Sequence, residues 1–211
     1  MVKSSRKRIP ICGNDRPRRP GQTRARFDSV TVDPVFFNYS AVQSSILVGV
    51  NGPAVWVRVE GKGNFLNSGS LKEFAQEMVN RGYREFVVDL ENCVMMDSTF
   101  MGTLAAVALR LREIGQGHLH VVHCGQRSLD LLSGLGLDQI FDIRSNGAVA
   151  PECEEMKKNA DAVAEAKKKE TTETMLEAHQ ALCDAAPENL SRFKDVLEYL
   201  KQDLHQTTAG K

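Results

Sequence analysis

Asp97 and Ser98 are the pair of residues whose types and position could support regulated chemistry. They follow the apolar run 87–90 and a short loop, and they precede a long helix-forming segment. If Asp97 is the N-cap, Ser98 is the first helical residue, close to unpaired amides and the positive end of the helix dipole. A phosphate on Ser98 would be tolerated there and would add about two negative charges. The pair therefore predicts either a phosphoacceptor that switches partner binding or, with Thr99, a capping cluster without further role.

Three histidines, His118, His120 and His123, lie close enough in the sequence to resemble a metal cluster. Alternation along a strand puts His118 and His120 on one face and His123 on the other. No carboxylate or thiolate accompanies them at the spacing of a zinc site. We therefore predict solvated or hydrogen-bonded rings at a strand edge and no metal site.

Motifs for catalysis are missing from the sequence. There is no G-x-S-x-G nucleophile elbow and no G-x-G-x-x-G dinucleotide loop. The segment around Lys62 lacks the spacing of a phosphate-binding P-loop. Cys93 lies among apolar residues, which raise the pKa of a thiol and make it unreactive. We predict that the chain is not an enzyme and that it has no cofactor of its own.

Strands and helices alternate around the Asp97–Ser98 junction. Two strand-forming runs, 46–50 and 54–60, flank Asn51-Gly52, which is a strong hairpin signal. Ser70 and Glu73 match a capping box, so residues 61–69 are predicted as a flexible loop and a helix is predicted from there to Gly82. The remaining predicted elements are a strand over 85–90, a helix over 98–114, a strand over 118–124, a short helix over 128–135 and a strand over 138–143.

This order predicts an α/β fold: a small domain with a mainly parallel, mixed sheet, built from an N-terminal hairpin followed by βα units. We assign the domain to residues 41–148. Residues 1–40 are predicted to be a basic, disordered N-terminal extension. Residues 149–211 are predicted to be an α-helical C-terminal extension, because apolar stripes at helical spacing run through 174–204.

Composition fits an ordinary soluble protein of 211 residues with zero net charge. Residues 1–26 nevertheless carry nine Lys or Arg against one Asp, so the rest of the chain has a charge of −8. Such a basic tail favours a solvated arm over nucleic-acid or membrane attraction, and no direct nucleic-acid binding is expected. Five cysteines without a CxxC pair favour a reducing, cytoplasmic location, and no apolar run is long enough to span a membrane.

Residues 46–143 resemble the STAS domain, the module of bacterial anti-sigma-factor antagonists and of sulphate-transporter tails. Residues 87–93, leading into 96–102, look like the family's strand followed by its Asp-Ser-Ser/Thr-x-x-Gly phosphorylation motif. The loop around Gly61 with the helix after it, and residues 129–135 with Ile140-Phe141, are similar to further parts of the domain.

The resemblance implies that Ser98 is phosphorylated by a partner anti-sigma factor, which is itself a serine kinase of the GHKL type. The kinase supplies nucleotide and metal. The unphosphorylated antagonist binds the kinase and releases the sigma factor, and phosphorylation breaks this complex. Asp97 would position the acceptor, and Thr99 would be a secondary acceptor.

Two departures from the family pattern bear on partner binding. The family's usual Gly-Leu-Gly ending is replaced by Phe100, Met101 and Gly102, which predicts a bulkier surface beside Ser98. The loop after the second strand has Lys62 and Asn64 near the expected partner surface, where many antagonists carry an acid.

Two functions are compatible with these observations. The first is an anti-sigma-factor antagonist, a phosphoprotein of signal transduction and transcription regulation that is switched off by phosphorylation at Ser98. The alternative is a STAS scaffold subunit of a transporter or signalling assembly, which is not phosphorylated and docks through its C-terminal helices. These helices could also mediate oligomerisation.

Overall fold

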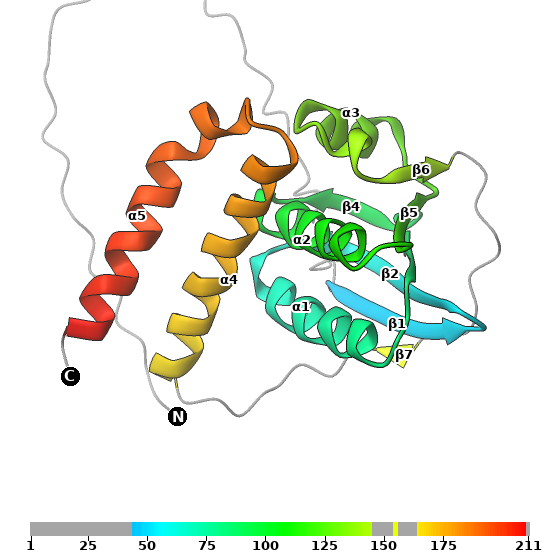
Figure 1. The fold of residues 1–211 in the computed structure, drawn as a ribbon, viewed down its shortest axis with the longest axis horizontal. Coiled ribbons are helices and arrows are strands. Elements are labelled where there is room, and N and C mark those ends of the chain that lie inside the picture. Colours follow the sequence, from blue (N-terminus) through cyan, green and yellow to red (C-terminus); the bar gives the residue numbers. More distant parts are fainter. Residues whose placement is uncertain (1–43, 145–153, 156–163, 210–211) are drawn as a thin grey trace, which may run out of the picture. The chain divides into compact units, whose positions relative to one another are not determined.

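The structure is a computed structural model that describes residues 44–144, 154–155 and 164–209 (Figure 1). These residues belong to one compact unit, Tyr39–Lys211. The predicted disordered extension over residues 1–40 lies outside the described residues. None of the described helices combines the length and the apolar character needed to cross a membrane.

The elements alternate between strands and helices up to residue 144 and are helical after residue 164. The strands are β1 (Ser45–Asn51), β2 (Ala54–Gly63), β3 (Glu85–Asp89), β4 (Cys93–Met96), β5 (His118–Val122), β6 (Asp142–Arg144) and β7 (Glu154–Glu155). The helices are α1 (Phe65–Asn80), α2 (Ser98–Ile114), α3 (Gln126–Gly134), the 3₁₀ turn η1 (Leu137–Gln139), α4 (Ala164–Ala185) and α5 (Asn189–Ala209).

The sheet is mixed, with strand order β6-β5-β3-β2-β1-β7, and β4 pairs separately with the end of β2. β1 and β2 form the predicted antiparallel hairpin, closed by Asn51↔Ala54 with Gly52 at a φ of 58°. β2, β3, β5 and β6 run parallel to one another, as βα crossovers require. The predicted fold class is therefore confirmed.

One hydrophobic core holds the sheet, its helices and part of the C-terminal extension together. Alternate residues of the parallel strands, such as Val57 and Val88, face the apolar stripes of α1 and α2. The predicted helix over 98–114 is confirmed as α2, and its buried face carries an apolar stripe of Met101, Leu104, Ala105, Ala108 and Leu111. Leu182 of α4 is fully buried in the same core. α4 and α5 form an antiparallel hairpin, with α4 packed on the domain and α5 on α4 (Figure 1).

Three local predictions were wrong. Residues 93–96 form strand β4 instead of a loop, since backbone pairing with the end of β2 outweighs the mixed side-chain pattern. Residues 138–143 are not one strand, because Gly136, at a φ of 69°, starts the η1 turn and leaves only β6 for the sheet. Residues 61–69 are not a flexible loop, because β2 runs to Gly63 and α1 begins at Phe65.

The start of α1 is fixed by a capping box built from two asparagine side chains. Asn64 is the extended N-cap residue, and its Oδ1 accepts a hydrogen bond from the Leu66 amide at 3.0 Å. In return, the Asn67 Oδ1 accepts from the Asn64 amide at 2.9 Å. The predicted box of Ser70 and Glu73 lies inside the helix instead. Asn at both positions satisfies the same orphan amides as Ser and Glu.

We predict that Asn64→Ala lowers the free energy of unfolding by about 1 kcal/mol, because it removes the N-cap acceptor. Ser70→Ala, the matched control within α1, should change it by less than about 0.5 kcal/mol. Urea unfolding of both variants at one pH measures the difference. If Ser70→Ala lowered the free energy of unfolding more than Asn64→Ala, this would contradict a helix that starts at Phe65.

Candidate functional site

Asp97 joins the N-terminal ends of α1 and α2. Its Oδ1 accepts a hydrogen bond from the Phe100 amide at 2.8 Å, which caps α2 as predicted. Its Oδ2 accepts from the Phe65 amide in the first turn of α1 at 2.9 Å. The Asp97 amide itself donates to the Gly63 carbonyl at 3.0 Å. One carboxylate therefore fixes two helix ends at the same edge of the domain.

Ser98 is the first residue of α2, as predicted, but its hydroxyl is engaged by the C-terminal extension. The Ser98 Oγ lies 3.0 Å from Nε2 of His179 in α4. The Nδ1 of His179 lies 2.7 Å from the Met175 carbonyl. Because a carbonyl can only accept, Nδ1 carries the proton in the neutral ring and the Ser98 hydroxyl donates to Nε2. Ser98 is half-buried and His179 is only 5% exposed.

Sequence reasoning missed the Ser98–His179 pair because 81 positions separate the two residues. The one available signal was that His179 lies on the apolar stripe of the C-terminal helix. A polar ring on such a stripe needs a hydrogen-bond partner once the stripe is buried. The partner could not be named without the packing of α4 on α2.

The motif residues after Ser98 point away from the surface. Thr99 is only 5% exposed, so its predicted role as a secondary acceptor is not favoured. Phe100 and Met101 are buried in the core, and the expectation that they make the surface bulkier is wrong. Phe100 packs so closely on Gly63 that a Cβ there would overlap its ring. The extra bulk of this motif is accommodated inside the domain.

Lys62 and Asn64 lie at the same edge as Asp97. Lys62 is exposed at the end of β2, opposite Met95 of β4. The side chain of Asn64 caps α1, so its first role is structural. Their predicted place near a partner surface stays a prediction, although they belong to β2 and the cap of α1 and not to a loop.

Four apolar side chains are exposed on two segments next to Asp97, the first turn of α1 and strand β4. Phe65 and Leu66, in the first turn of α1, are 41% and 73% exposed. Val94 and Met95, on β4, are 54% and 41% exposed. We call these four residues the junction surface. Exposed apolar side chains next to a polar site are typical of protein-interaction surfaces. The sequence did not indicate this surface because both segments were predicted as loops.

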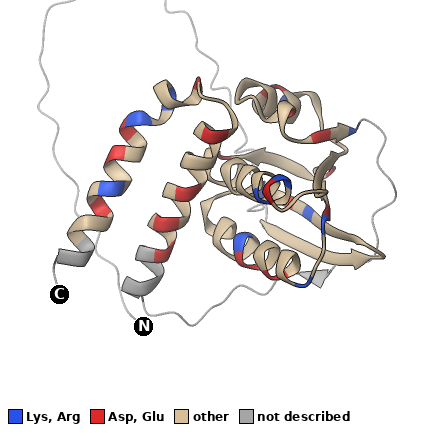
Figure 2. Cartoon of the chain, viewed as in Figure 1, with Lys and Arg blue, Asp and Glu red and all other residues tan. Residues whose placement is uncertain are grey.

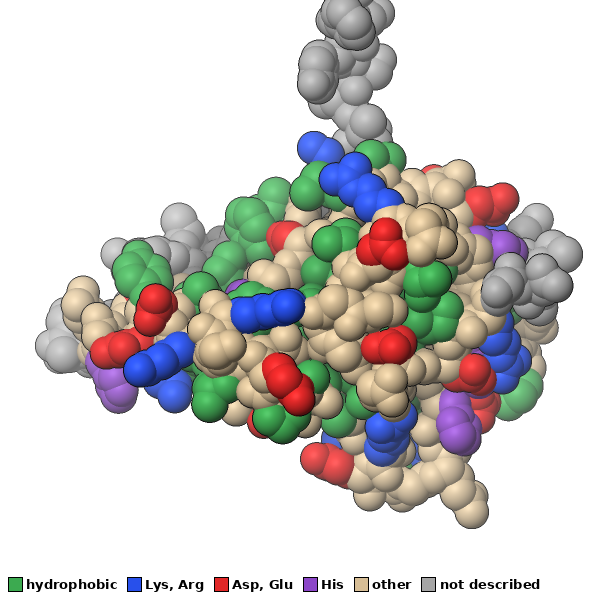
Figure 3. All heavy atoms as spheres, turned by 90° about the horizontal axis from the view of Figure 1, so that it is seen from above, with side chains coloured by type: hydrophobic (Ala, Val, Ile, Leu, Met, Phe, Trp, Pro, Cys, Tyr) green, Lys and Arg blue, Asp and Glu red, His purple; other side chains and the backbone are tan. Residues whose placement is uncertain are grey.

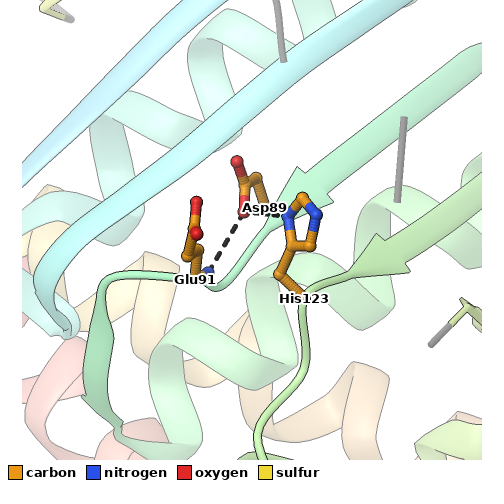
Figure 4. Close-up of side chains that lie close together, drawn as sticks. All are labelled: Asp89, Glu91 and His123. Atoms are coloured by element: carbon orange, nitrogen blue, oxygen red, sulfur yellow. Dashed lines mark hydrogen bonds and ion pairs between the residues drawn. The ribbon is translucent and has the colours of Figure 1, made fainter. Parts of the chain in front are cut away.

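A second polar cluster lies at the ends of β3 and β5 (Figure 4). The buried Asp89 carboxylate accepts hydrogen bonds from the Glu91 amide at 3.1 Å, from His123 Nδ1 at 2.9 Å and from Arg58 Nε at 3.1 Å. Ligand-type atoms of Asp89, Glu91 and His123 lie within 4.8 Å of one another. The expectation that no carboxylate accompanies the histidines is therefore wrong for His123.

The geometry of this second cluster favours a structural role. A cation would compete with Arg58 for one Asp89 oxygen and with the direct His123–Asp89 hydrogen bond for the other. The cluster ties β2, β3 and β5 together at one edge of the sheet. Burial alone would raise the pKa of Asp89, but the hydrogen bonds from His123, the Glu91 amide and Arg58 outweigh it and lower the pKa.

Of the two histidines in β5, His118 is exposed and the ring of His120 is hydrogen-bonded, as the sequence predicted, although carboxylates accompany His120 as well. His120 lies between Glu85 of β3 and Asp142 of β6, with 2.8 Å from a ring nitrogen to each carboxylate. His118 stacks on His120, with ring centroids 6.1 Å apart. Burial raises the pKa of the Cys93 thiol, which agrees with its predicted low reactivity.

A sequence profile of the STAS domain matches residues 45–150, which is half of the chain. The chain belongs to the STAS domain family. The matched region ends before α4, so the hairpin that carries His179 lies outside the family's domain.

Solved structures similar to this chain include that of TM1081, a candidate anti-sigma factor antagonist of Thermotoga maritima. It is 20% identical with a TM-score of 0.44, and the match covers 47% of this chain and 85% of that protein. An NMR structure of TM1081 matches with 21% identity, 46% and 78% coverage and a TM-score of 0.43. Unphosphorylated SpoIIAA, an anti-sigma factor antagonist, matches with 14% identity, 48% and 87% coverage and a TM-score of 0.41. No curated protein sequence matches the chain.

We predict that Asp89→Asn lowers the free energy of unfolding at neutral pH by about 1.5–3 kcal/mol, because buried hydrogen bonds to a charged group are lost. The Asp89 pKa is lowered in the fold, so its stabilisation is present above the ordinary value of 3.8 and lost as the pH falls through the lowered pKa.

The difference between wild type and Asp89→Asn should therefore shrink below about pH 4. Urea unfolding at pH 7 and pH 3 measures it. The matched control is Asp142→Asn, because the pKa of Asp142 is also lowered, chiefly by its hydrogen bond from Arg144, but this carboxylate is solvent-exposed. A loss for Asp142→Asn as large as that for Asp89→Asn would contradict the role of burial.

Proposed function

We propose that the chain is a binding protein of the anti-sigma-factor antagonist type, which captures a partner on the junction surface and is switched off by phosphorylation of Ser98. The observation that carries the proposal is the position of Ser98. It is the first residue of α2, beside the Asp97 carboxylate that joins the ends of α1 and α2. The membership of the STAS family and the Asp-Ser-Thr motif agree with this position.

Phosphorylation at Ser98 would end binding without unfolding the domain. A phosphate at a helix N-terminus is stabilised by the amides and the dipole of the helix. The same phosphate adds about two negative charges next to Asp97, whose carboxylate holds the first turn of α1 with Phe65. A partner that buries the junction surface would have to desolvate the phosphate as well, which costs several kcal/mol.

The proposed partner is an anti-sigma factor that is also a serine kinase of the GHKL type. The kinase brings nucleotide and metal, so the chain itself acts as a substrate and a ligand and not as an enzyme. Its place would be the cytoplasm, in the regulation of transcription through a sigma factor. On the face shown in Figure 3, acidic and basic side chains are interspersed with apolar ones, which suits a protein partner better than nucleic acid.

A second candidate is the scaffold function without phosphorylation. It is favoured by the hydrogen bond that holds the Ser98 hydroxyl on His179. It is also favoured by α5, where Leu190, Val196 and Tyr199 are exposed. In this case a partner would dock on α5, and changes at Ser98 would leave its affinity unchanged.

The phosphorylation test uses the full chain, magnesium-ATP and a GHKL-type serine kinase. We expect the intact mass of the wild type to rise by one phosphoryl group, and that of Ser98→Ala to stay unchanged. Thr99→Val should be phosphorylated like the wild type, because Thr99 is buried. No gain in the wild type with any kinase of this class, or an equal gain in Ser98→Ala, would overturn the assignment.

A pair of surface variants separates the two candidates. Leu66→Asp places a charge in the junction surface and should weaken kinase capture at least about tenfold, which corresponds to 1.4 kcal/mol. Tyr199→Asp places the same charge on the exposed face of α5 and should leave capture unchanged. Titration calorimetry with the kinase measures both. The opposite result would favour the scaffold function.

A further inference from the structure

We propose that the α4–α5 hairpin is the chain's own competitor for the face around Ser98, so that docking of α4 and phosphorylation of Ser98 exclude each other. The role of phosphorylation in this inference rests on the proposed function. The hairpin lies outside the STAS match and supplies the group that holds the Ser98 hydroxyl.

α4 packs directly on the helix that carries the acceptor. A Cβ on Gly102 would overlap the backbone of Ala178, so α2 and α4 touch through their main chains. One residue further along α4, His179 accepts the hydrogen bond of the Ser98 hydroxyl. Ser98 and Gly102 are four residues apart and therefore lie on one face of α2, which α4 covers. Figure 1 shows α4 beside α1 and α2.

The two ends of the hairpin are held unequally. At the turn between α4 and α5, the buried Asn189 donates to the Leu135 and Leu182 carbonyls at 2.9 and 2.8 Å. Leu182 is fully buried there. At the Ser98 end the buried apolar side chains of α4 are small, such as Ala178. We therefore expect α4 to open at the Ser98 end while the turn stays anchored.

Packing of α4 on α1 and α2 is also incomplete beyond the Ser98 contact. A pocket of about 210 Å³ remains between α1, α2 and α4, lined among others by Ala75, Val107 and Ala178. The ion pair between Lys72 and Glu177 crosses the same region, with both side chains partly exposed to solvent. An exposed ion pair contributes about 0–1 kcal/mol. Release of this part of α4 therefore costs less than release of the turn.

A phosphate does not fit the docked arrangement. The Ser98 Oγ is 3.0 Å from Nε2 of His179, which leaves no room for a phosphoryl group between them. Nε2 presents a lone pair in the neutral ring, because Nδ1 donates to the Met175 carbonyl. Residues 170–185 of α4 contain four acidic residues and no Lys or Arg, and the acidic positions recur along α4 in Figure 2. A phosphate would meet like charge on this helix.

Linkage makes the exclusion reciprocal. If docked α4 lowers the equilibrium affinity of a kinase for the face around Ser98, binding of the kinase lowers the docking of α4 by the same factor. The same equilibrium reduces the affinity of any partner that needs this face, because only the open fraction of the molecules can bind. α4 thus sets how much of the chain is available for capture and for phosphorylation.

The first experiment needs no kinase. Hydrogen–deuterium exchange is followed in the full chain for the wild type, for Ser98→Glu and for chain carrying phosphoserine at position 98. We expect faster amide exchange in residues 171–181 of both changed chains, with β3 and β5 as protected as in the wild type. Ser98→Ala is the matched control, because it removes the hydrogen bond without adding bulk or charge, and its α4 should stay protected.

Unchanged protection of residues 171–181 in the phosphoserine chain would overturn the exclusion. Increased protection would overturn it as well, because it would mean that a protonated His179 pairs with the phosphate and locks α4. If the amides of β3 in Ser98→Glu exchange as fast as those of residues 171–181, this variant is unfolded. The phosphoserine chain alone then decides whether phosphorylation opens α4.

The second experiment measures access to Ser98. Ala178→Arg places a long side chain in the contact between α4 and α2, and Gln180→Arg places the same side chain on the exposed face of α4. With the chain well below saturation of the kinase, the initial rate of Ser98 phosphorylation follows the open fraction, so Ala178→Arg should raise it by about 5- to 150-fold. Gln180→Arg should leave the rate unchanged.

The two experiments separate failure of this inference from failure of the proposed function. Equal phosphorylation rates in the wild type, Ala178→Arg and Gln180→Arg would overturn the inference and leave the phosphoacceptor assignment intact. No phosphorylation even in Ala178→Arg would overturn the proposed function, whereas faster exchange of α4 in the phosphoserine chain would still support the exclusion.

Discussion

The carboxylate of Asp97 is the group on which the arrangement of this site depends. It accepts hydrogen bonds from the Phe100 amide of α2 and the Phe65 amide of α1. The backbone amide of Asp97, directly after β4, donates to the Gly63 carbonyl at the end of β2. Without this carboxylate, two helix ends would each leave a donor unsatisfied near the domain surface, where a lost cap costs about 1 kcal/mol. The orientation of Ser98 and of the apolar residues around it follows from this single bridge.

The motif after Asp97 divides its residues between two sides of α2. Phe100 and Met101 face the core, and Gly63 gives the Phe100 ring the space that a side chain there would fill. Ser98 and Gly102 face α4, where Gly102 lets the two backbones meet. The glycine of the motif thus has a packing role in this chain that comes from the C-terminal hairpin. A bulky motif can therefore be accommodated without changing what surrounds the serine.

Local chemistry predicted much of this fold and little of its site. The Asn51-Gly52 hairpin, the α2 helix and the cap at Asp97 depend on neighbouring residues only, and all three were predicted correctly. The start of α1 was misplaced because Asn64 and Asn67 cap with amides where Ser70 and Glu73 match the commoner pattern. The contacts of Ser98 with His179 and of Asp89 with His123 join residues far apart in the sequence, and no spacing rule predicts such pairs.

The serine hydroxyl and a phosphate at position 98 differ in how strongly they affect the docking of α4. A hydroxyl that donates to a buried imidazole contributes about 0.5–1.5 kcal/mol net, so Ser98 adds little to the docking of α4. A phosphate in the same place would have to lose its hydration against a ring lone pair and an acidic helix, which costs several kcal/mol. The unmodified serine is therefore compatible with docked and open α4 alike, whereas the phosphorylated serine is compatible only with the open state. A site that tolerates both states of α4 before modification and one state afterwards converts a covalent change into a conformational one.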